Sequence, residues 1–295
     1  MTIRCGRVLE FIVNRLAADR RECTKVTGTY DQFSPSLVPC SDTMNSEIPK
    51  RQHPVRKLFA KLQSICPYPS GVIAVPEQIQ GTSFFPGGTG LWFNETRKLP
   101  DLPIGGVMVL GHDFHSVAGY EWSRENEAEN LKTPTWRHLL PLLARTSIPL
   151  ERCFFTNVYM GLRVGKATTG RFPGAASPDF VKRCQMFFLL QITTQQPTLI
   201  LALGGYVPAF LAPLSAQLTP WGCFKSFRER DAHDAALIRG VSFGCSGVQP
   251  CVVASLVHPS FRPSNVHRRS WGSFAGDAAE VALLQEAVKR AGVVA

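Results

Sequence analysis

The sequence has no two cysteines at the Cys-x-x-Cys spacing, although nine cysteines occur among its 295 residues. Structural zinc sites usually use such closely spaced ligands, so the spacing argues against one. The cysteine count is odd and the positions are scattered, which does not fit a disulfide framework. We expect mostly buried free thiols in a reducing compartment, with Cys153 and Cys251 inside apolar, strand-like runs.

The sequence also lacks an apolar run long enough to cross a bilayer. We therefore expect no membrane partner and a cytoplasmic location. The N-terminal stretch is basic and amphipathic, but Glu10, Asn14 and Arg15 interrupt its apolar residues, unlike in a secretory signal. Glu10 and Asp19 also break the acid-poor pattern of a transit peptide.

Acidic residues are in the minority: 22 Asp and Glu stand against 32 Lys and Arg, and the net charge is +10. A basic excess of this size is typical of proteins that bind a polyanion, and nucleic acid is the first candidate. Solubility alone is the alternative explanation. Hydrophobic residues make up 44% of the chain, which is enough for a sizeable core.

The pattern along the chain predicts an N-terminal arm, residues 1–52, and one domain, residues 53–295. In the arm, a short helical stretch at Val8–Arg20 precedes Thr27–Lys50, whose Ser, Thr and Pro content indicates a linker. Near the start of the domain, Tyr68–Asn94 is rich in Gly and Pro and predicts an ordered covering loop.

Strand and helix patterns alternate through the rest of the domain, with no internal repeat. Such alternation predicts a parallel sheet with right-handed crossovers and helices on both faces. We predict a three-layer α/β/α fold around a short, mainly parallel sheet of four strands. The predicted strands are Val107–Leu110, Cys153–Thr156, Thr198–Leu203 and Val252–Val257. The predicted helices are Val55–Ile65, Thr135–Ala144 with a kink or break at Pro141, Pro178–Gln195, Tyr206–Leu211 and Ala275–Ala291.

Two of these strands end abruptly at polar, chemically capable side chains. One apolar run leads into Gly111–Ser116, and the other leads into His258–Asn265. In open α/β sheets, ligands bind in the crevice outside the carboxyl ends of the strands. We therefore expect Asp113 and His258 to belong to one site.

Four segments have an order and spacing that point to a known family. Gly111-His112-Asp113-Phe114-His115 follows the first core strand, and His258-Pro259-Ser260 follows the last. Between them lie Phe154–Val158, a strand with Asn157 at its end, and Phe180–Gly204, a helix followed by a strand. Over residues 100–290 the chain thus resembles the uracil-DNA glycosylase superfamily. The resemblance implies a monofunctional DNA glycosylase, which flips a base out of double- or single-stranded DNA and hydrolyses its N-glycosidic bond. We expect a monomer that leaves an abasic site and needs no cofactor.

The chain departs from the family pattern at three places. Of the four cysteines that the iron-sulfur branch needs, only Cys184 stands at a matching position, so we expect no cluster. Phe114 replaces the proline of the first motif, and His115 replaces the tyrosine that closes the pocket over the base. A more open pocket predicts tolerance of a 5-modified cytosine, including a hypermodified cytosine of phage DNA, besides uracil. Such a substrate would suggest antiviral defence rather than ordinary repair.

The resemblance makes Asp113 and His258 the catalytic pair. A carboxylate below the sugar positions water and stabilises the oxocarbenium-like transition state. His258 donates a hydrogen bond to the base oxygen as it becomes anionic, and Pro259 restricts His258 to extended geometry. The alternative roles are a turn or helix cap for Asp113 and a packed side chain for His258.

Other residues are expected to contact the base or the DNA backbone. The amide of Asn157 can read a base edge, and Trp136 or Phe114 can stack on the base. The alternatives are a strand-end turn for Asn157, a core position for Trp136 and solvated surface charges for the cations. The predicted base-binding residues are His112, Phe114, His115, Trp136 and Asn157. The predicted DNA-binding residues are Ser116, Arg163, Lys166, Ser260, Phe261, Arg262, Ser264, Arg268 and Arg269, with Arg171 beside them, and Phe261 or Arg262 could act as the wedge.

Two other functions stay open from the sequence. A non-catalytic nucleic-acid-binding module on the same scaffold would use the basic balance equally well. A metal-dependent hydrolase would need His112, Asp113, His115 and His258 as ligands, although their spacing fits no standard zinc motif. Gly204-Gly205 before a helix is either a phosphate cradle or a tight turn between strand and helix.

Overall fold

The computed structural model describes residues 52–93 and 98–293, and the fold is reported for these residues. The chain divides into two units, Met1–Lys50 and Arg51–Ala295. The helix predicted at Val8–Arg20 and the linker predicted at Thr27–Lys50 lie outside the described residues.

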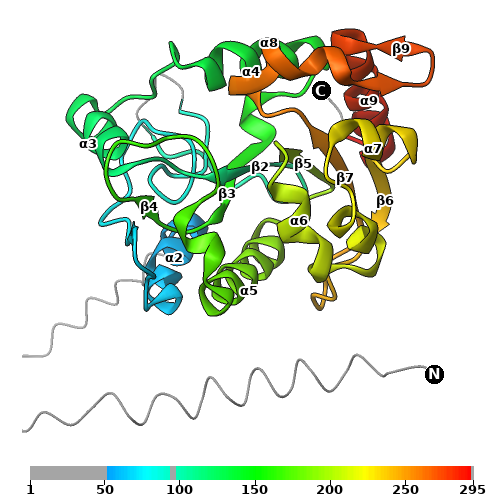
Figure 1. Cartoon of the computed structure of the whole chain (residues 1–295). Helices are drawn as coiled ribbons and strands as arrows, with labels where there is room; N and C mark the ends of the chain where they lie inside the picture. Colours follow the sequence, from blue (N-terminus) through cyan, green and yellow to red (C-terminus); the bar gives the residue numbers. More distant parts are fainter. Residues whose placement is uncertain (1–51, 94–97, 294–295) are drawn as a thin grey trace, which may run out of the picture. The chain divides into compact units, whose positions relative to one another are not determined.

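A mostly parallel sheet forms the centre of the second unit (Figure 1). In the described part of the chain this sheet has five strands in the order β3-β2-β5-β7-β6. The four predicted strands are all present and parallel to one another. The prediction of a four-stranded sheet was wrong, because β6 pairs antiparallel with β7 at the edge. The strands are β2 (Val107–Asp113), β3 (Cys153–Tyr159), β5 (Leu199–Leu203), β6 (Leu237–Val241) and β7 (Cys251–Leu256).

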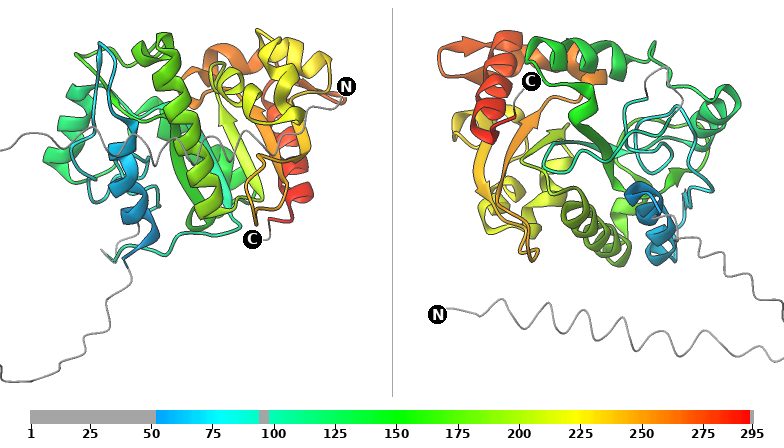
Figure 2. Two further views of the ribbon diagram at one scale, coloured as in Figure 1. Left: turned by 90° about the horizontal axis from the view of Figure 1, so that it is seen from below. Right: turned by 180° about the vertical axis from the view of Figure 1, so that it is seen from behind.

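The parallel strands are almost entirely buried, because helices cover both faces of the sheet. Met108 and Leu110 pack on one face with residues of α2, α5 and α6. Val107 and Val109 point to the opposite face and pack with α4 and α9. Figure 1 shows α5 and α6 on one side of the sheet and α4 on the other, and Figure 2 gives two further views of these layers. The domain is therefore a helix–sheet–helix sandwich.

The helix signals in the sequence place most helix ends correctly. The helices are α2 (Pro54–Ala60), α3 (Val117–Asn126), α4 (Pro134–Arg145), α5 (Pro178–Gln195), α6 (Val207–Leu211), α7 (Phe227–Ala232), α8 (Arg262–Asn265) and α9 (Gly276–Ala291). Pro134 and Pro178 stand in the first turns of α4 and α5, where a missing N–H costs nothing. The helix α4 continues through Pro141, so of the predicted kink or break the break was wrong. The helices α3, α7 and α8 were not predicted. The helix predicted at Val55–Ile65 is α-helical only to Ala60 and continues as a 3-10 helix over Lys61–Ile65.

The segment predicted as a covering loop lies along the outer edge of β3. Phe85 N donates to Phe155 O at 3.0 Å, and Phe155 N donates to Gly90 O at 2.8 Å. The loop thus satisfies backbone groups that an open sheet edge would expose. Short two-stranded pairings accompany it: β1 (Val72–Ile73) with β4 (Leu162–Arg163), and β8 (Ser270–Trp271) with β9 (Phe274–Ala275).

The chain reverses its direction across the sheet at β2. From β2 it crosses to β3 on one side, and from β3 it crosses back to β5 on the other side of β2. The connections leave β2 and β5 toward opposite faces, because α4 and α6 lie on opposite faces. Such a switch point opens a crevice at the carboxyl ends of the strands. Among the described helices, none is both long and apolar enough to traverse a lipid bilayer.

Candidate functional site

A pocket of about 480 Å³ lies at this switch point. It brings together residues from the ends of β2, β3, β5 and β7. Asp113 and His258, predicted to share one site, both line it. Its walls are formed by Phe84, Gly111, His112, Asp113, Phe114, His115, Thr133, Pro134, Thr135, Asn157, Arg163, Thr168, Thr169, Gly170, Leu203, Gly204, Gly205, Tyr206, His258, Ser260 and Phe261.

Asp113 is the last residue of β2, and both of its carboxylate oxygens are hydrogen bonded. Arg163 donates from Nε to Oδ1 at 2.9 Å and from Nη2 to Oδ2 at 2.8 Å. His112 Nδ1 lies 2.8 Å from Oδ2. Burial alone would raise the pKa of Asp113, but the hydrogen bonds from Arg163 and His112 outweigh it and hold the pKa below its usual value. Asp113 is therefore a fixed, ionised carboxylate rather than the cap of a turn.

Arg163 is 4% exposed and serves as the buried partner of Asp113. Its Nη1 donates to Thr169 O and Arg171 O at 3.2 Å each, and its Nη2 donates to Gly170 O at 2.8 Å. We call residues 164–171 the mouth segment. Arg163 holds this segment at the pocket, and all three of its guanidinium nitrogens donate to oxygens of the protein. The predicted contact of Arg163 with DNA phosphate was therefore wrong.

His112 completes a row from Arg163 through Asp113 into the pocket. Its ring stacks on Tyr206, with centroids 4.7 Å apart and an interplanar angle of 25°. Because Nδ1 faces the carboxylate, the neutral ring carries its proton there and leaves Nε2 as the acceptor. The sequence prediction missed Tyr206, which is 50% exposed at the mouth. Its position directly after Gly204-Gly205, at a strand end, was the available signal.

His258 follows β7 and is oriented by its own loop. Its Nδ1 accepts a hydrogen bond from Ser260 N at 3.2 Å, so the neutral ring carries its proton on Nε2. Burial lowers the pKa of His258 to about 4; nearby Asp113 opposes this shift and nearby His112 adds to it. At neutral pH the side chain is thus an uncharged hydrogen-bond donor.

Gly204 approaches His258 closely. Its φ of +91° is in the left-handed region, and a Cβ there would stand 3.2 Å from His258 Cβ. The helix α6 that follows is only five residues long. These observations favour the tight turn over the phosphate cradle for Gly204-Gly205.

Asn157 lies beside Gly111 in the register of β2 and β3. Its Nδ2 donates to Phe85 O at 2.9 Å, which fixes the amide in the sheet layer. A Cβ on Gly111 would stand 2.4 Å from Asn157 Oδ1, so only glycine fits there. Asn157 lines the pocket, and its predicted contact with the base stays a prediction.

Phe114 and His115 form the wall between this pocket and a smaller one of about 330 Å³. His115 Nδ1 accepts from Ser116 N at 2.8 Å, and burial lowers the pKa of His115 despite the nearby Asp113. A Cβ on Gly119 would stand 1.9 Å from the ring of His115, so α3 needs glycine at this contact. Both aromatic side chains thus reach the pocket as predicted, whereas their contact with a base stays a prediction.

Trp136 is a core residue rather than a stacking surface. It is 2% exposed and packs against Phe84, Trp92 and Phe155 with ring centroids 5.3–5.4 Å apart. It lines the smaller pocket but not the one that holds Asp113 and His258. The predicted stacking of Trp136 on the base was wrong, because the apolar face of α4 carries it into the core.

Three further predicted DNA contacts are used inside the protein. Arg262 is 7% exposed and binds Glu280 and Asp277. Arg269 is 2% exposed and binds Asp231. Ser116 is 1% exposed and caps α3 by accepting from Gly119 N. These three predictions were wrong because the two arginines pair with carboxylates of the protein and the Ser116 hydroxyl caps α3.

The remaining predicted DNA contacts lie where a ligand could reach them. Ser260 is half-buried at the pocket, with Oγ 2.7 Å from Thr135 Oγ1. Phe261 is 46% exposed beside the ring of His258. The exposed side chains are Lys166, Arg171, Ser264 and Arg268. Their contact with DNA stays a prediction.

The side chains proposed for a metal-dependent hydrolase do not form a ligand cage. Within residues 52–93 and 98–293, no three His, Cys, Asp or Glu side chains are grouped closely enough to hold a metal ion. Asp113 is already paired with Arg163. The geometry therefore gives this alternative no support.

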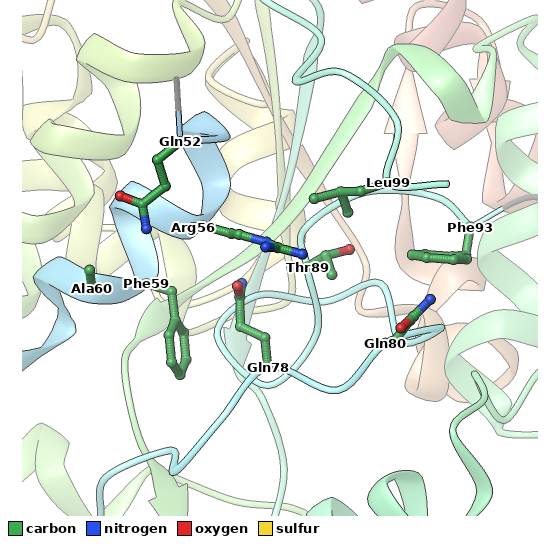
Figure 3. A pocket seen from close by; sticks show the side chains of 9 residues that line it. All are labelled: Gln52, Arg56, Phe59, Ala60, Gln78, Gln80, Thr89, Phe93 and Leu99. Carbon is green, nitrogen blue, oxygen red and sulfur yellow. The ribbon is translucent and has the colours of Figure 1, made fainter. Parts of the chain in front are cut away.

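A second pocket of about 470 Å³ lies beside α2 (Figure 3). The guanidinium of Arg56 extends into it, among Gln78, Thr89 and Phe59. No histidine, cysteine or carboxylate lines this pocket, so it offers no group suited to acid–base chemistry. We therefore place the candidate active site at the carboxyl ends of the strands.

A scan of the sequence against protein-family models and a search of curated proteins both found no match. The resemblance to the uracil-DNA glycosylase superfamily thus depends on the motifs and their arrangement.

Proposed function

We propose that the chain is a DNA glycosylase with the fold of the uracil-DNA glycosylase superfamily. The observation that carries the proposal is the meeting of Asp113 and His258 in one pocket at the switch point. One is an ionised carboxylate, and the other is a neutral imidazole that presents Nε2–H. Cleavage of an N-glycosidic bond needs both, because the sugar becomes cationic while the base becomes anionic.

His258 stabilises the departing base in this mechanism. Its Nε2–H donates to a base oxygen as negative charge grows there. The ring needs little reorientation during the reaction, because the hydrogen bond from Ser260 N already fixes it. Its low pKa keeps the ring neutral, so it stabilises the base by hydrogen bonding rather than by a full charge. Asp113 provides the negative potential that stabilises the oxocarbenium-like sugar.

The pocket walls suit a flipped, flat base. The stacked rings of His112 and Tyr206 and the ring of Phe114 offer aromatic surface, and Asn157 offers an amide at the strand ends. Bases extruded from a duplex are usually held by stacking and by hydrogen bonds to their Watson–Crick edge. The exposed cations Lys166, Arg171 and Arg268 would contact phosphates.

Uracil or a 5-modified cytosine is the proposed substrate. His115 stands where the superfamily has a tyrosine, and its ring packs closely against Gly119. That arrangement favours room beside the base for a substituent, as in the hypermodified cytosines of phage DNA. A role in antiviral defence would follow from that substrate.

The test is base release measured by mass spectrometry from plain, uracil-containing and modified-cytosine phage DNA. Wild type is compared with His258→Ala, Asp113→Asn and the exposed control His233→Ala. We expect free base from wild type and the control, and rates lower by about 10²–10³ for His258→Ala, as for loss of one preorganised donor.

The outcomes separate the functions. No base released from any DNA, with binding intact, would contradict the proposal and favour a non-catalytic binding module. Release of uracil alone would support the glycosylase and contradict the 5-modified substrate.

A further inference from the structure

The structure leaves open which group takes the proton of the attacking water. Asp113 is a weak acceptor, since Arg163 donates to both of its oxygens and His112 contacts one of them. Protonating this carboxylate would break a buried ion pair, which is costly. Another base must therefore stand close to it.

The other histidines of the pocket are poorly placed for this role. His258 already has Nδ1 occupied by Ser260 N, and its Nε2 carries the proton that the base oxygen needs. His115 accepts from Ser116 N through Nδ1, and its Nε2 carries the ring proton. Neither ring has a carboxylate at hydrogen-bond distance to stabilise its protonated form.

His112 has the required arrangement. Its Nδ1 faces Asp113 Oδ2 at 2.8 Å, and stacking on Tyr206 fixes the plane of the ring. The residue lines the pocket, and none of the described residues is hydrogen bonded to its Nε2. A carboxylate that orients one ring nitrogen while the other faces the reacting water is the arrangement of a catalytic general base.

We propose that His112, oriented by Asp113, is the general base of the glycosylase reaction, which rests on the proposed function. His112 Nε2 accepts one proton of a water molecule, and the water oxygen forms a bond to C1′ of the sugar. The bond from C1′ to the base nitrogen breaks, and its electron pair leaves with the base. His258 Nε2–H stabilises that anion, which takes up a proton from solvent. Asp113 stabilises the His112 imidazolium until the proton is released.

The test measures single-turnover base release by wild type, His112→Gln, His112→Ala and Asp113→Asn, on whichever DNA of the uracil and modified-cytosine panel wild type cleaves. His233→Ala is the control, and DNA affinity is measured for each variant. We expect His112→Gln to release base about 10²-fold or more slowly, with affinity within a few-fold of wild type. Added imidazole should restore part of the rate of His112→Ala, because it can occupy the vacated site and accept the proton. It should not restore Asp113→Asn, whose ring is present but misoriented.

Three results would overturn the inference or its basis. A rate for His112→Gln within three-fold of wild type would show that no proton passes to this ring. Equal loss in both His112 variants without imidazole rescue, in proteins with unchanged thermal melting, would assign the ring a packing role. Absence of base release by wild type would instead remove the proposed function itself.

Discussion

A buried carboxylate behind the His258 loop gives the sharpest prediction for stability. Glu280 in α9 is fully buried, and its Oε1 accepts from Val257 N at 2.5 Å, one residue before His258. It also binds Arg262, four residues after His258, and lies 3.4 Å from Arg269 Nη1. One carboxylate therefore anchors both ends of the turn that presents His258.

Replacing Glu280 with Gln keeps its size but removes the charge. Breaking a buried ion pair by removing one partner costs about 3–5 kcal/mol, since it leaves the other charge uncompensated. We expect the lower value of this range for Glu280→Gln, because Arg262 still pairs with Asp277 and Arg269 still pairs with Asp231. We expect a loss of about 3 kcal/mol in the free energy of unfolding. With a urea slope of about 3 kcal/mol per molar, the midpoint should fall by about 1 M.

The matched control is Glu286→Gln on the same helix. Glu286 pairs with Arg290 one turn later, both partners are partly exposed, and such pairs contribute about 0.5 kcal/mol or less. A midpoint for Glu280→Gln that matches the control would refute the reasoning. So would a double variant, Glu280→Leu with Arg262→Met, that is less stable than Glu280→Leu alone, since an apolar pair should replace the ion pair at little cost.

Three further predictions concern the pocket itself. Gly111→Ala should destabilise the fold by about 1–3 kcal/mol and slow base release, because the new Cβ would stand 2.4 Å from Asn157 Oδ1; an unchanged thermal melt would contradict this. Arg163→Lys should increase protease cleavage within the mouth segment, since lysine cannot bind Asp113 and the mouth carbonyls together, and limited proteolysis with mapped cut sites would show whether the segment stays protected instead. The pKa of His258 falls to about 4 on folding, so the unfolded chain binds more protons below about pH 6.5. The free energy of unfolding should therefore decrease by up to about 3 kcal/mol as the pH falls from about 6.5 to 4. Urea midpoints should vary less over this range for His258→Asn, and an equal pH dependence of the midpoint in both proteins would argue against a buried neutral ring.

The parallel strands and their helices were predictable because their residues are buried on both faces. Pro178–Gln195 was predicted with its observed ends, from a proline at the first turn and a long apolar pattern. β6 was missed because its residues are partly exposed and its pairing with β7 shifts register. The helix α3 was missed because half of its residues are polar and the apolar ones show no clear helical spacing, although Ser116 is a suitable cap.

The position of the site could be predicted from the arrangement of the strands more than from the chemistry of its side chains. Asp113 and His258 were placed together because parallel strands end at the same edge of a sheet. Which arginines are buried in ion pairs could not be predicted in the same way. Nothing local distinguishes Arg163, which pairs with Asp113, from Lys166, which is exposed three residues later. Only the three-dimensional position of each carboxylate decides which cation is buried.

Arg163 grips the mouth segment solely through main-chain oxygens of Thr169, Gly170 and Arg171. Every amino acid carries the same oxygen, so the identities of these side chains are irrelevant to the grip. The entrance can thus change its side chains without disturbing Asp113, provided that the backbone path is kept and that Gly165 and Gly170 retain their left-handed φ of +86° and +83°. A library randomised at residue 164 and residues 166–169 would therefore test, for the proposed glycosylase, whether the entrance can be changed to admit other bases while Asp113 keeps its partners.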